Sequence, residues 1–285
     1  MTTSYKDLQY VKPKQATPKA QPKPVYGLQK VRRIVAIASG KGGVGKSTVA
    51  VNLAVALARQ GWKVGLADAD IYGPSVPKMT ATEGVQPTVQ LVDEVEMLMP
   101  VERYGVKWTS IGYFVAPNQP LIWRGPMATN ALRQIVLQVA WGELDILLID
   151  LPPGTGDIHL SIIHDVKLSG AIVVSTPQAV ALTDVEKGVN MFLNDKVNVP
   201  VLGLVENMAW FTPAELPDNR YYIFGKEGCL KLANKLGLPL LAQLPLVQSI
   251  REGSDNGLPE AAQEHAATAP FTLFAERVIE LLKLD

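Results

Sequence analysis

Apolar residues along this chain follow two alternating patterns, short continuous runs and longer stretches with helical spacing. Short apolar runs, typical of buried strands, occupy residues 34–38, 63–68, 145–150, 171–175, 201–206 and 240–244. Apolar residues at helical spacing occur at about 49–58, 127–139, 180–192, 228–236 and 271–284. Buried strands that alternate with helices predict an α/β fold, in which a mostly parallel sheet is covered by helices on both faces.

Residues 86–114 interrupt this alternation of strands and helices. Apolar and polar residues alternate one by one around 89–99 and again at 106–111, which is the spacing of half-buried strands. We therefore expect a β-hairpin or a similar excursion between the second strand and the next helix.

Charge is distributed unevenly between the amino-terminal segment and the rest of the chain. The formal net charge is zero, but residues 1–33 hold eight Lys or Arg residues and one acidic residue. The remainder holds 19 of the 27 basic and 26 of the 27 acidic residues. Four prolines and few apolar residues occur before residue 31. We therefore predict a disordered Lys/Pro-rich tail at 1–30 and a single α/β domain at 31–285.

Composition also excludes several classes of protein. An acidic body is a poor general surface for nucleic acid, because contacts to phosphate dominate that affinity. The chain has no run of eighteen apolar residues, no apolar secretory core in its first ten residues, and one cysteine, too few for an intrachain disulfide. The last predicted helix carries few basic residues on its polar side, so we expect it to pack on the core. A cytoplasmic protein that binds neither nucleic acid nor membrane is therefore expected.

Residues 40–48, which read GKGGVGKST, carry the strongest chemical signal of the chain. This segment, here called the phosphate loop, satisfies the pattern G-x-x-x-x-G-K-[S/T] and lies between a predicted strand and a predicted helix, as the motif requires. Such a loop surrounds phosphates with backbone N–H groups and places a helix N-terminus against them. The predicted nucleotide-binding residues are Gly40, Gly42, Gly43, Val44, Gly45, Lys46, Ser47 and Thr48, with Lys46 on the β- and γ-phosphates and the Ser47 hydroxyl on Mg²⁺.

Carboxylates follow two of the predicted strands, at the sheet edge where ligands bind in parallel α/β folds. Asp150 ends the run at 145–150 and is expected to hold Mg²⁺ or its waters. Asp68 and Asp70 follow the second strand, and one of the pair would orient the attacking water; we favour Asp70. The alternative role for any one of these aspartates is a helix cap.

The residue after the strand at 201–206 indicates which base is bound. A guanine-reading N-K-x-D sequence is not found late in the chain, whereas Asn207 directly follows this strand. An asparagine amide there would hydrogen-bond the edge of an adenine. ATP is therefore the expected nucleotide.

Together these motifs resemble the Mrp/ApbC branch of the deviant-Walker-A ATPases, relatives of MinD, ParA and the nitrogenase iron protein. The resemblance covers nearly all of the chain from residue 33 and is carried by SGKGGVGKST (39–48), DADIYGPSVP (68–77), WRGPM (123–127), DLPPGTGD (150–157), STPQ (175–178) with Asp184, and VENM (205–208). It implies a P-loop NTPase fold, with ATP and Mg²⁺ as cofactors and slow ATP hydrolysis. It also implies a homodimer in which Lys41 reaches the phosphates held by the other subunit and acts in catalysis like an arginine finger.

The same resemblance implies an iron–sulfur cluster, which a C-P-x-C pair just after N-M holds between two subunits. This chain departs from that pattern, because Thr212 and Glu215 stand at the two cysteine positions. Their oxygen atoms are hard donors and do not replace thiolates, whereas a helix capping box would use both residues. Cys229 is an alternative cluster ligand in a dimer, but a lone cysteine is more often a buried small hydrophobe.

Three functions are compatible with these patterns. The leading hypothesis is an ATP-binding and ATP-hydrolysing protein that acts in iron–sulfur cluster assembly or transfer through an ATP-gated homodimer, with iron–sulfur client or assembly proteins as partners. The first alternative is a nucleotide-switched scaffold or regulatory ATPase that binds no cluster. The second is a positioning ATPase like MinD or ParA, which needs a basic helix or patch that residues 34–285 lack.

Overall fold

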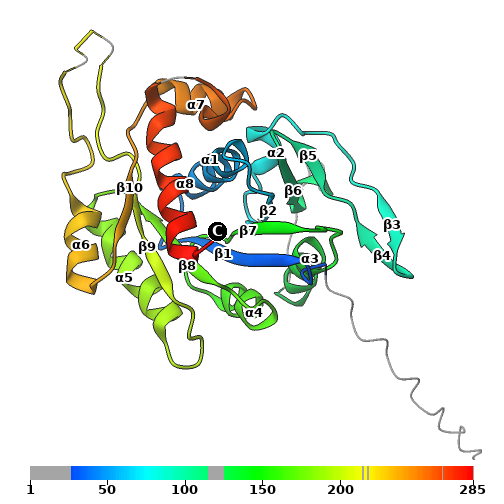
Figure 1. The fold of residues 1–285 in the computed structure, drawn as a ribbon. Helices are drawn as coiled ribbons and strands as arrows, with labels where there is room; N and C mark the ends of the chain where they lie inside the picture. The colour runs from blue at the N-terminus through cyan, green and yellow to red at the C-terminus, as the bar shows by residue number, and fades with distance from the viewer. Residues whose placement is uncertain (1–26, 115–124, 214, 217, 265, 285) are drawn as a thin grey trace, which may run out of the picture.

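A mostly parallel sheet forms the centre of the protein (Figure 1). The computed structural model describes residues 27–114, 125–213, 215–216, 218–264 and 266–284. The strand order across the sheet is β10 (Leu240–Gln243), β9 (Val201–Glu206), β8 (Gly170–Ser175), β1 (Val31–Ser39), β7 (Leu144–Asp150), β2 (Val64–Asp68), β6 (Val106–Ser110) and β5 (Val101–Arg103). Every neighbouring pair is parallel except β5 and β6, which form an antiparallel edge. The predicted sheet is therefore confirmed.

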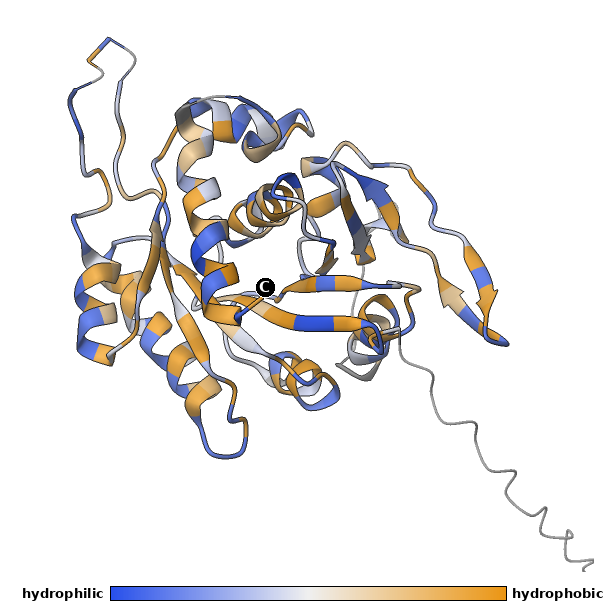
Figure 2. Cartoon of the chain, viewed as in Figure 1, coloured by the Kyte–Doolittle hydropathy of each residue, from blue (hydrophilic) through white to orange (hydrophobic). Residues whose placement is uncertain are grey.

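Helices cover both faces of this sheet, as predicted (Figure 1). The helices α1 (Lys46–Arg59) and α8 (Ala269–Leu282) share a core with one face, and the opposite core holds α3 (Gly125–Leu137), α4 (Asp157–Asp165), α5 (Ala179–Leu193) and α6 (Gly228–Leu236). Successive side chains of a strand point to opposite faces. Val35 and Ile37 of β1 therefore pack with α1 and α8, whereas Ile34 and Ala36 pack on the other side. Figure 2 shows the apolar residues concentrated along the central strands.

The last helix, α8, packs on the core. Phe271, Phe274 and Val278 are buried, and the helix contacts α1 and β10. The expectation that this helix docks on the body of the protein is therefore confirmed. Among the described helices, none combines the length and the hydropathy that a membrane span needs.

The excursion between β2 and α3 is only partly separate from the sheet. β3 (Val89–Val92) and β4 (Val95–Leu98) form the predicted antiparallel hairpin. The second alternating stretch instead becomes β6, which pairs in parallel with β2 inside the main sheet. The predicted tail lies outside the described residues up to residue 26, as do the first two residues of the WRGPM sequence.

Three helices are present that the apolar spacing did not predict. Two are the short α2 (Val76–Met79) and α4, which follow the carboxylate-bearing loops after β2 and β7. The third is α7 (Gln248–Asp255), in which only Ile250 and Gly253 are buried. With a single large apolar residue, this segment has no repeated apolar spacing from which a helix could be predicted. The 3-10 turns η1 (Ile111–Tyr113), η2 (Glu260–Ala262) and η3 (Ala266–Thr268) complete the described elements.

Candidate functional site

The phosphate loop joins β1 to α1 as an open turn. Gly45 directly precedes the helix, and Gly43 and Gly45 have φ angles of +83° and +80°, a left-handed conformation that other residues rarely adopt. Gly42 and Gly43 are exposed, so the backbone of the turn is accessible to a ligand. The first N–H groups of a helix have no partner within the helix, so α1 can present them to an anion.

Lys46 is the buried cation at the base of this loop. Its side chain is 5% exposed, and its ammonium lies 2.6 Å from Asp150 Oδ1 and 3.5 Å from Asp70 Oδ2. Burial alone would lower the pKa of Lys46, but the charge and hydrogen bond of Asp150, followed by the charge of Asp70, raise it above its ordinary value. The lysine is therefore held as a cation beside the phosphate loop.

The other residues of the predicted loop lie around this cation. Gly40 follows β1 directly, Val44 is buried under the turn, and Ser47 and Thr48 are half-buried in the first turn of α1. The Ser47 hydroxyl oxygen lies 3.4 Å from the Lys46 ammonium. A hydroxyl, an ammonium and a carboxylate thus meet at the start of α1.

Asp150 ends β7, the strand between β1 and β2. It is fully buried, and its Oδ2 atom has no hydrogen-bond partner among the described residues. A buried carboxylate oxygen without a partner is costly, and Mg²⁺ or a water bound to it would satisfy this atom. In nucleotide sites Mg²⁺ takes few protein ligands, and the phosphates supply others. Asp150 and the neighbouring Ser47 hydroxyl therefore fit the predicted Mg²⁺ site.

Asp68 holds the loop after β2 in place. It lies opposite Asp150 in the register of β2 and β7 and is fully buried. Its Oδ1 accepts a hydrogen bond from the backbone N–H of Asp70 at 3.2 Å, and its Oδ2 accepts from the Val76 N–H at 3.2 Å and the Ser110 hydroxyl at 2.8 Å. Burial, followed by the charge of Asp150, raises the pKa of Asp68 to about 7. These contacts fasten the loop to β6.

Asp70 is the member of the aspartate pair that faces the lysine. Its side chain is 13% exposed, and its Oδ2 lies 3.5 Å from the Lys46 ammonium. Burial raises the pKa of Asp70 above its ordinary value, and the charge of Lys46 opposes this shift. Because the Asp68 carboxylate is fully buried whereas the Asp70 side chain is partly exposed, Asp70 is the aspartate that a water beside the loop can contact.

Lys41 carries the second cation of the loop. The residue is half-buried, and its backbone carbonyl accepts a hydrogen bond from the Ser39 hydroxyl at 3.0 Å. Its ammonium makes no hydrogen bond or ion pair with any residue in the described ranges. The side chain is therefore available to contact another molecule.

Asn207 follows β9 and touches the phosphate loop. Its side-chain amide donates a hydrogen bond to the Val44 carbonyl at 2.9 Å, and the residue is 8% exposed. The residue expected at the edge of an adenine is thus in contact with the loop that would hold the phosphates.

Cys229 lies in the core, so the hypothesis that it is a cluster ligand does not fit the structure. The residue is fully buried at the start of α6, and its sulfur donates a weak hydrogen bond to the Thr176 carbonyl at 3.8 Å. Burial, followed by the charge of Glu206, raises the pKa of the thiol well above its ordinary value. A neutral, enclosed thiol agrees with the alternative stated above, in which Cys229 packs as a small buried hydrophobic residue.

The two positions that correspond to the missing cysteines lie on the loop between β9 and α6. Thr212 is half-buried and Glu215 is exposed. No group of three or more His, Cys, Asp or Glu residues that could hold a metal occurs in the described part of the chain. The residues of one described copy therefore do not fit a thiolate-bound cluster.

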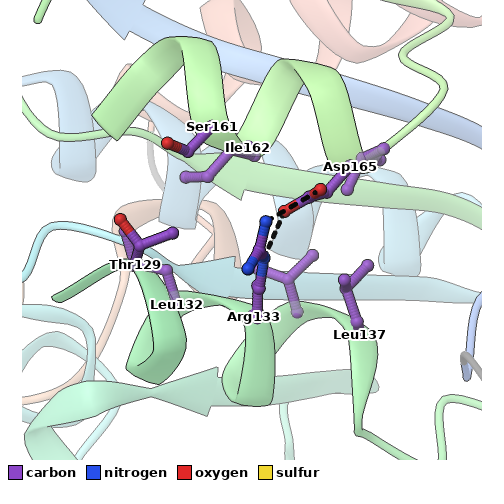
Figure 3. Close-up of a pocket in the computed structure, with 9 residues that line it drawn as sticks. Thr129, Leu132, Arg133, Leu137, Ser161, Ile162 and Asp165 are labelled. Carbon is purple, nitrogen blue, oxygen red and sulfur yellow. Dashed lines mark hydrogen bonds and ion pairs between the residues drawn. The ribbon is translucent and has the colours of Figure 1, made fainter. Parts of the chain in front are cut away.

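Contacts that the sequence patterns do not reveal hold the loop after β7 and the helix α4 that follows it. The His159 ring nitrogen Nε2 donates to the Pro152 carbonyl at 2.9 Å, inside this loop. Figure 3 shows Arg133 of α3 reaching across to Asp165 of α4, where Nε and Nη2 bind the two carboxylate oxygens at 2.5 Å and 3.2 Å. Both contacts fix α4, the helix that follows the loop, and neither follows from local spacing.

Comparison with known proteins places this site in a family. The ParA family model described as NUBPL iron-transfer P-loop NTPase matches residues 30–279. An Arabidopsis thaliana protein named iron-sulfur protein required for NADH dehydrogenase, mitochondrial, is 54% identical over 233 residues, which are 81% of this chain and 72% of that protein. A Synechocystis protein named iron-sulfur cluster carrier protein is 48% identical over 250 residues, 87% of this chain and 70% of that protein.

A solved structure shows the same fold. The nucleotide-binding protein of Archaeoglobus fulgidus, solved in complex with ADP, superposes with a TM-score of 0.71 at 40% identity. The match covers 83% of this chain and 90% of that one.

Proposed function

Because the chain belongs to the NUBPL iron-transfer P-loop NTPases of the ParA family, we propose that it binds and hydrolyses ATP and acts in iron–sulfur cluster transfer. The observation that carries this proposal is the buried cluster of Lys46, Asp150 and Asp70 at the base of the phosphate loop. Two relatives have names that refer to iron–sulfur proteins, and this chain covers most of the length of each. A structurally similar protein was solved in complex with ADP.

The geometry supports a definite role for each residue. The N–H groups of the phosphate loop and of the first turn of α1 bind the phosphates, and Lys46 moves from Asp150 to the β- and γ-phosphates. Asp150 and Ser47 hold Mg²⁺, which neutralises charge that develops on the phosphates when it is bound. Asp70 orients the attacking water, since its carboxylate faces the site. Lys41 contributes its ammonium to the phosphates bound by a second copy.

Exposed apolar side chains around the loop support a homodimer. Tyr72, Met127, Leu160 and Val180 are 70%, 58%, 42% and 73% exposed. Each lies in a loop or an early helical turn after a parallel strand, and so at the same sheet edge as the phosphate loop. Apolar side chains gathered at one exposed edge are typical of an interface. Two copies that meet at this edge would bring each Lys41 towards the other copy's nucleotide.

The test measures turnover and oligomeric state on the same sample. We expect wild-type protein to hydrolyse ATP slowly and to sediment as a dimer with ATP·Mg²⁺, and Lys46→Ala to lose both properties. Lys167→Ala, which changes an exposed lysine far from the loop in sequence, is the control. A protein that stays monomeric with saturating ATP·Mg²⁺ and releases no phosphate contradicts the proposal.

A second candidate function is favoured by the burial of Cys229 and by the oxygen donors of Thr212 and Glu215. In this alternative the same ATP-dependent dimer serves as a scaffold or regulator and binds no cluster itself. Anaerobic reconstitution with iron and sulfide separates the two functions. A broad visible absorption after desalting supports the cluster carrier, and a colourless protein that still dimerises with ATP supports the scaffold.

A further inference from the structure

Asn207 is fixed between the phosphate loop and the sheet. Its side-chain amide donates to the Val44 carbonyl at 2.9 Å. Its backbone N–H donates to the Ser175 carbonyl at 2.8 Å, at the end of the adjacent strand β8. Val44 is 2% exposed, so both ends of the first contact are in a largely water-free environment. One residue thus connects the loop, through its side chain, to the ends of β8 and β9, through its backbone.

Gly45 shows how closely the loop and Asn207 fit. A Cβ atom added to Gly45 would collide with the Asn207 side-chain nitrogen, and it would lie 3.6 Å from Met208 Cε. Glycine at this position therefore satisfies two requirements, the left-handed backbone and the space that Asn207 occupies. This fit is between the loop and Asn207 and needs no base.

We infer that Asn207 is a positioning residue for the phosphate loop, which keeps the loop in the conformation that binds phosphates. The inference deepens the proposed function and rests on it, and it differs from the expectation that Asn207 reads adenine. The Val44 carbonyl is buried, and loss of its amide donor would leave the turn free to rearrange. A turn that opens more often binds phosphates more weakly, whichever base is attached to them.

Inorganic tripolyphosphate distinguishes the two roles, because it has the phosphates of ATP and no base. We expect Asn207→Ala to weaken the binding of ATP·Mg²⁺ and of tripolyphosphate·Mg²⁺ by a similar factor, about tenfold, as for one buried hydrogen bond. The matched control is Asn234→Ala, which removes an exposed asparagine of α6. Weaker ATP binding with unchanged tripolyphosphate binding would mean that Asn207 reads the base, and it would overturn the inference.

Hydrogen exchange in the nucleotide-free protein gives a readout that needs no ligand. We expect the amides of residues 41–46 to exchange faster in Asn207→Ala than in the wild type or Asn234→Ala, with circular dichroism used to verify folding. Unchanged exchange overturns the inference whatever happens to binding. If the alanine variant does not fold, Asn207→Asp keeps the shape and removes the N–H donor. If the wild type binds neither ligand, the proposed function fails, while the exchange measurement still decides the role of Asn207.

Discussion

The Lys46 ammonium and the Asp150 carboxylate form a buried ion pair at 2.6 Å, at the base of the phosphate loop. The lysine expected to meet the phosphates thus neutralises the carboxylate expected to meet Mg²⁺. Asp70 lies 3.5 Å from the same ammonium. Nucleotide that draws Lys46 towards its phosphates would therefore leave Asp150 with the full negative charge that attracts Mg²⁺.

This ion pair predicts that the metal binds after the nucleotide. We expect free Mn²⁺, used as a paramagnetic substitute for Mg²⁺, to bind the nucleotide-free protein weakly. Lys46→Met should bind it at least about tenfold more tightly, because a unit charge about 4 Å away at an effective dielectric near 20 contributes more than about 1.4 kcal/mol. Electron paramagnetic resonance of free Mn²⁺ measures both affinities.

Lys63→Met is the control for the metal experiment, since Lys63 is exposed and pairs with Glu143 instead. Its Mn²⁺ affinity should equal that of the wild type. Equal affinity in wild type and Lys46→Met would show that the lysine does not compete with the metal.

Saturating nucleotide should stabilise the fold. ATP·Mg²⁺ at 100 times its Kd is expected to raise the free energy of unfolding by about 2.7 kcal/mol, because only the folded state binds it. Lys46→Ala should show no such increase, since the cation that meets the phosphates is gone. Urea unfolding with and without ATP·Mg²⁺ measures the difference. A full increase in the variant would place the nucleotide away from Lys46.

Lys41 should act on turnover and not on affinity. We expect Lys41→Ala to bind ATP·Mg²⁺ nearly as tightly as the wild type and to lose on the order of 10³-fold or more in turnover, the contribution of a cation supplied from a second subunit. Calorimetry and single-turnover hydrolysis measure the two quantities. An equal loss of both would mean that Lys41 serves the nucleotide of its own subunit.

Asp68 should give the stability a pH dependence near neutrality. Its pKa is raised to about 7 in the folded protein, whereas an unfolded aspartate has a pKa of about 3.9. The folded state therefore keeps a proton that the unfolded state has released, and this stabilisation, complete at low pH, is lost as pH rises through about 7. We expect the free energy of unfolding of nucleotide-free protein to fall from about pH 5 to about pH 7 and to level off above that, because the two states differ in bound protons only between the two pKa values.

Asp68→Asn should remove most of this fall, because it removes the titrating group. Asp195→Asn, at an exposed position, should retain the fall. Urea unfolding at the two pH values gives the slopes, and a slope unchanged in Asp68→Asn would assign the proton to another group.

Cys229 should be unreactive in the folded protein. The thiol is fully buried and its pKa is raised, so the thiolate that reacts with disulfide reagents is scarce and enclosed. We expect no reaction with dithionitrobenzoate under native conditions and one equivalent in guanidinium chloride. Rapid labelling of the native protein would reopen a role for this cysteine as a ligand.

Much of the site could be predicted from the sequence because its signals are local. The phosphate loop is one continuous segment, and its glycines and lysine follow from the motif. Asp150 and Asp70 follow buried strands, and parallel strands that lie side by side end at the same edge of a sheet. The family resemblance drawn from these segments is confirmed by the family model. The homodimer and the role of Lys41 remain predictions.

The contacts that refine the site could not be predicted, because they join distant parts of the chain. Ser110 meets Asp68 across 42 residues, and Asn207 meets Val44 across 163 residues. The hydrogen-bond partner of the Cys229 thiol is likewise distant in sequence, since Thr176 lies 53 residues before it. Such pairs depend on the order of strands in the sheet, which apolar spacing alone does not determine.

The register of β2 against β7 places Asp68 directly opposite Asp150. Side chains alternate between the two faces of a strand, so a shift of one position would put Ala67 or Ala69 beside Asp150 and turn the carboxylate to the other face. An insertion or deletion of one residue within β2 would thus disable the chemistry while every polar side chain stayed in the sequence. The number of residues in β2 is therefore constrained by function in the same way as the identity of Asp68 and Asp70 at its end.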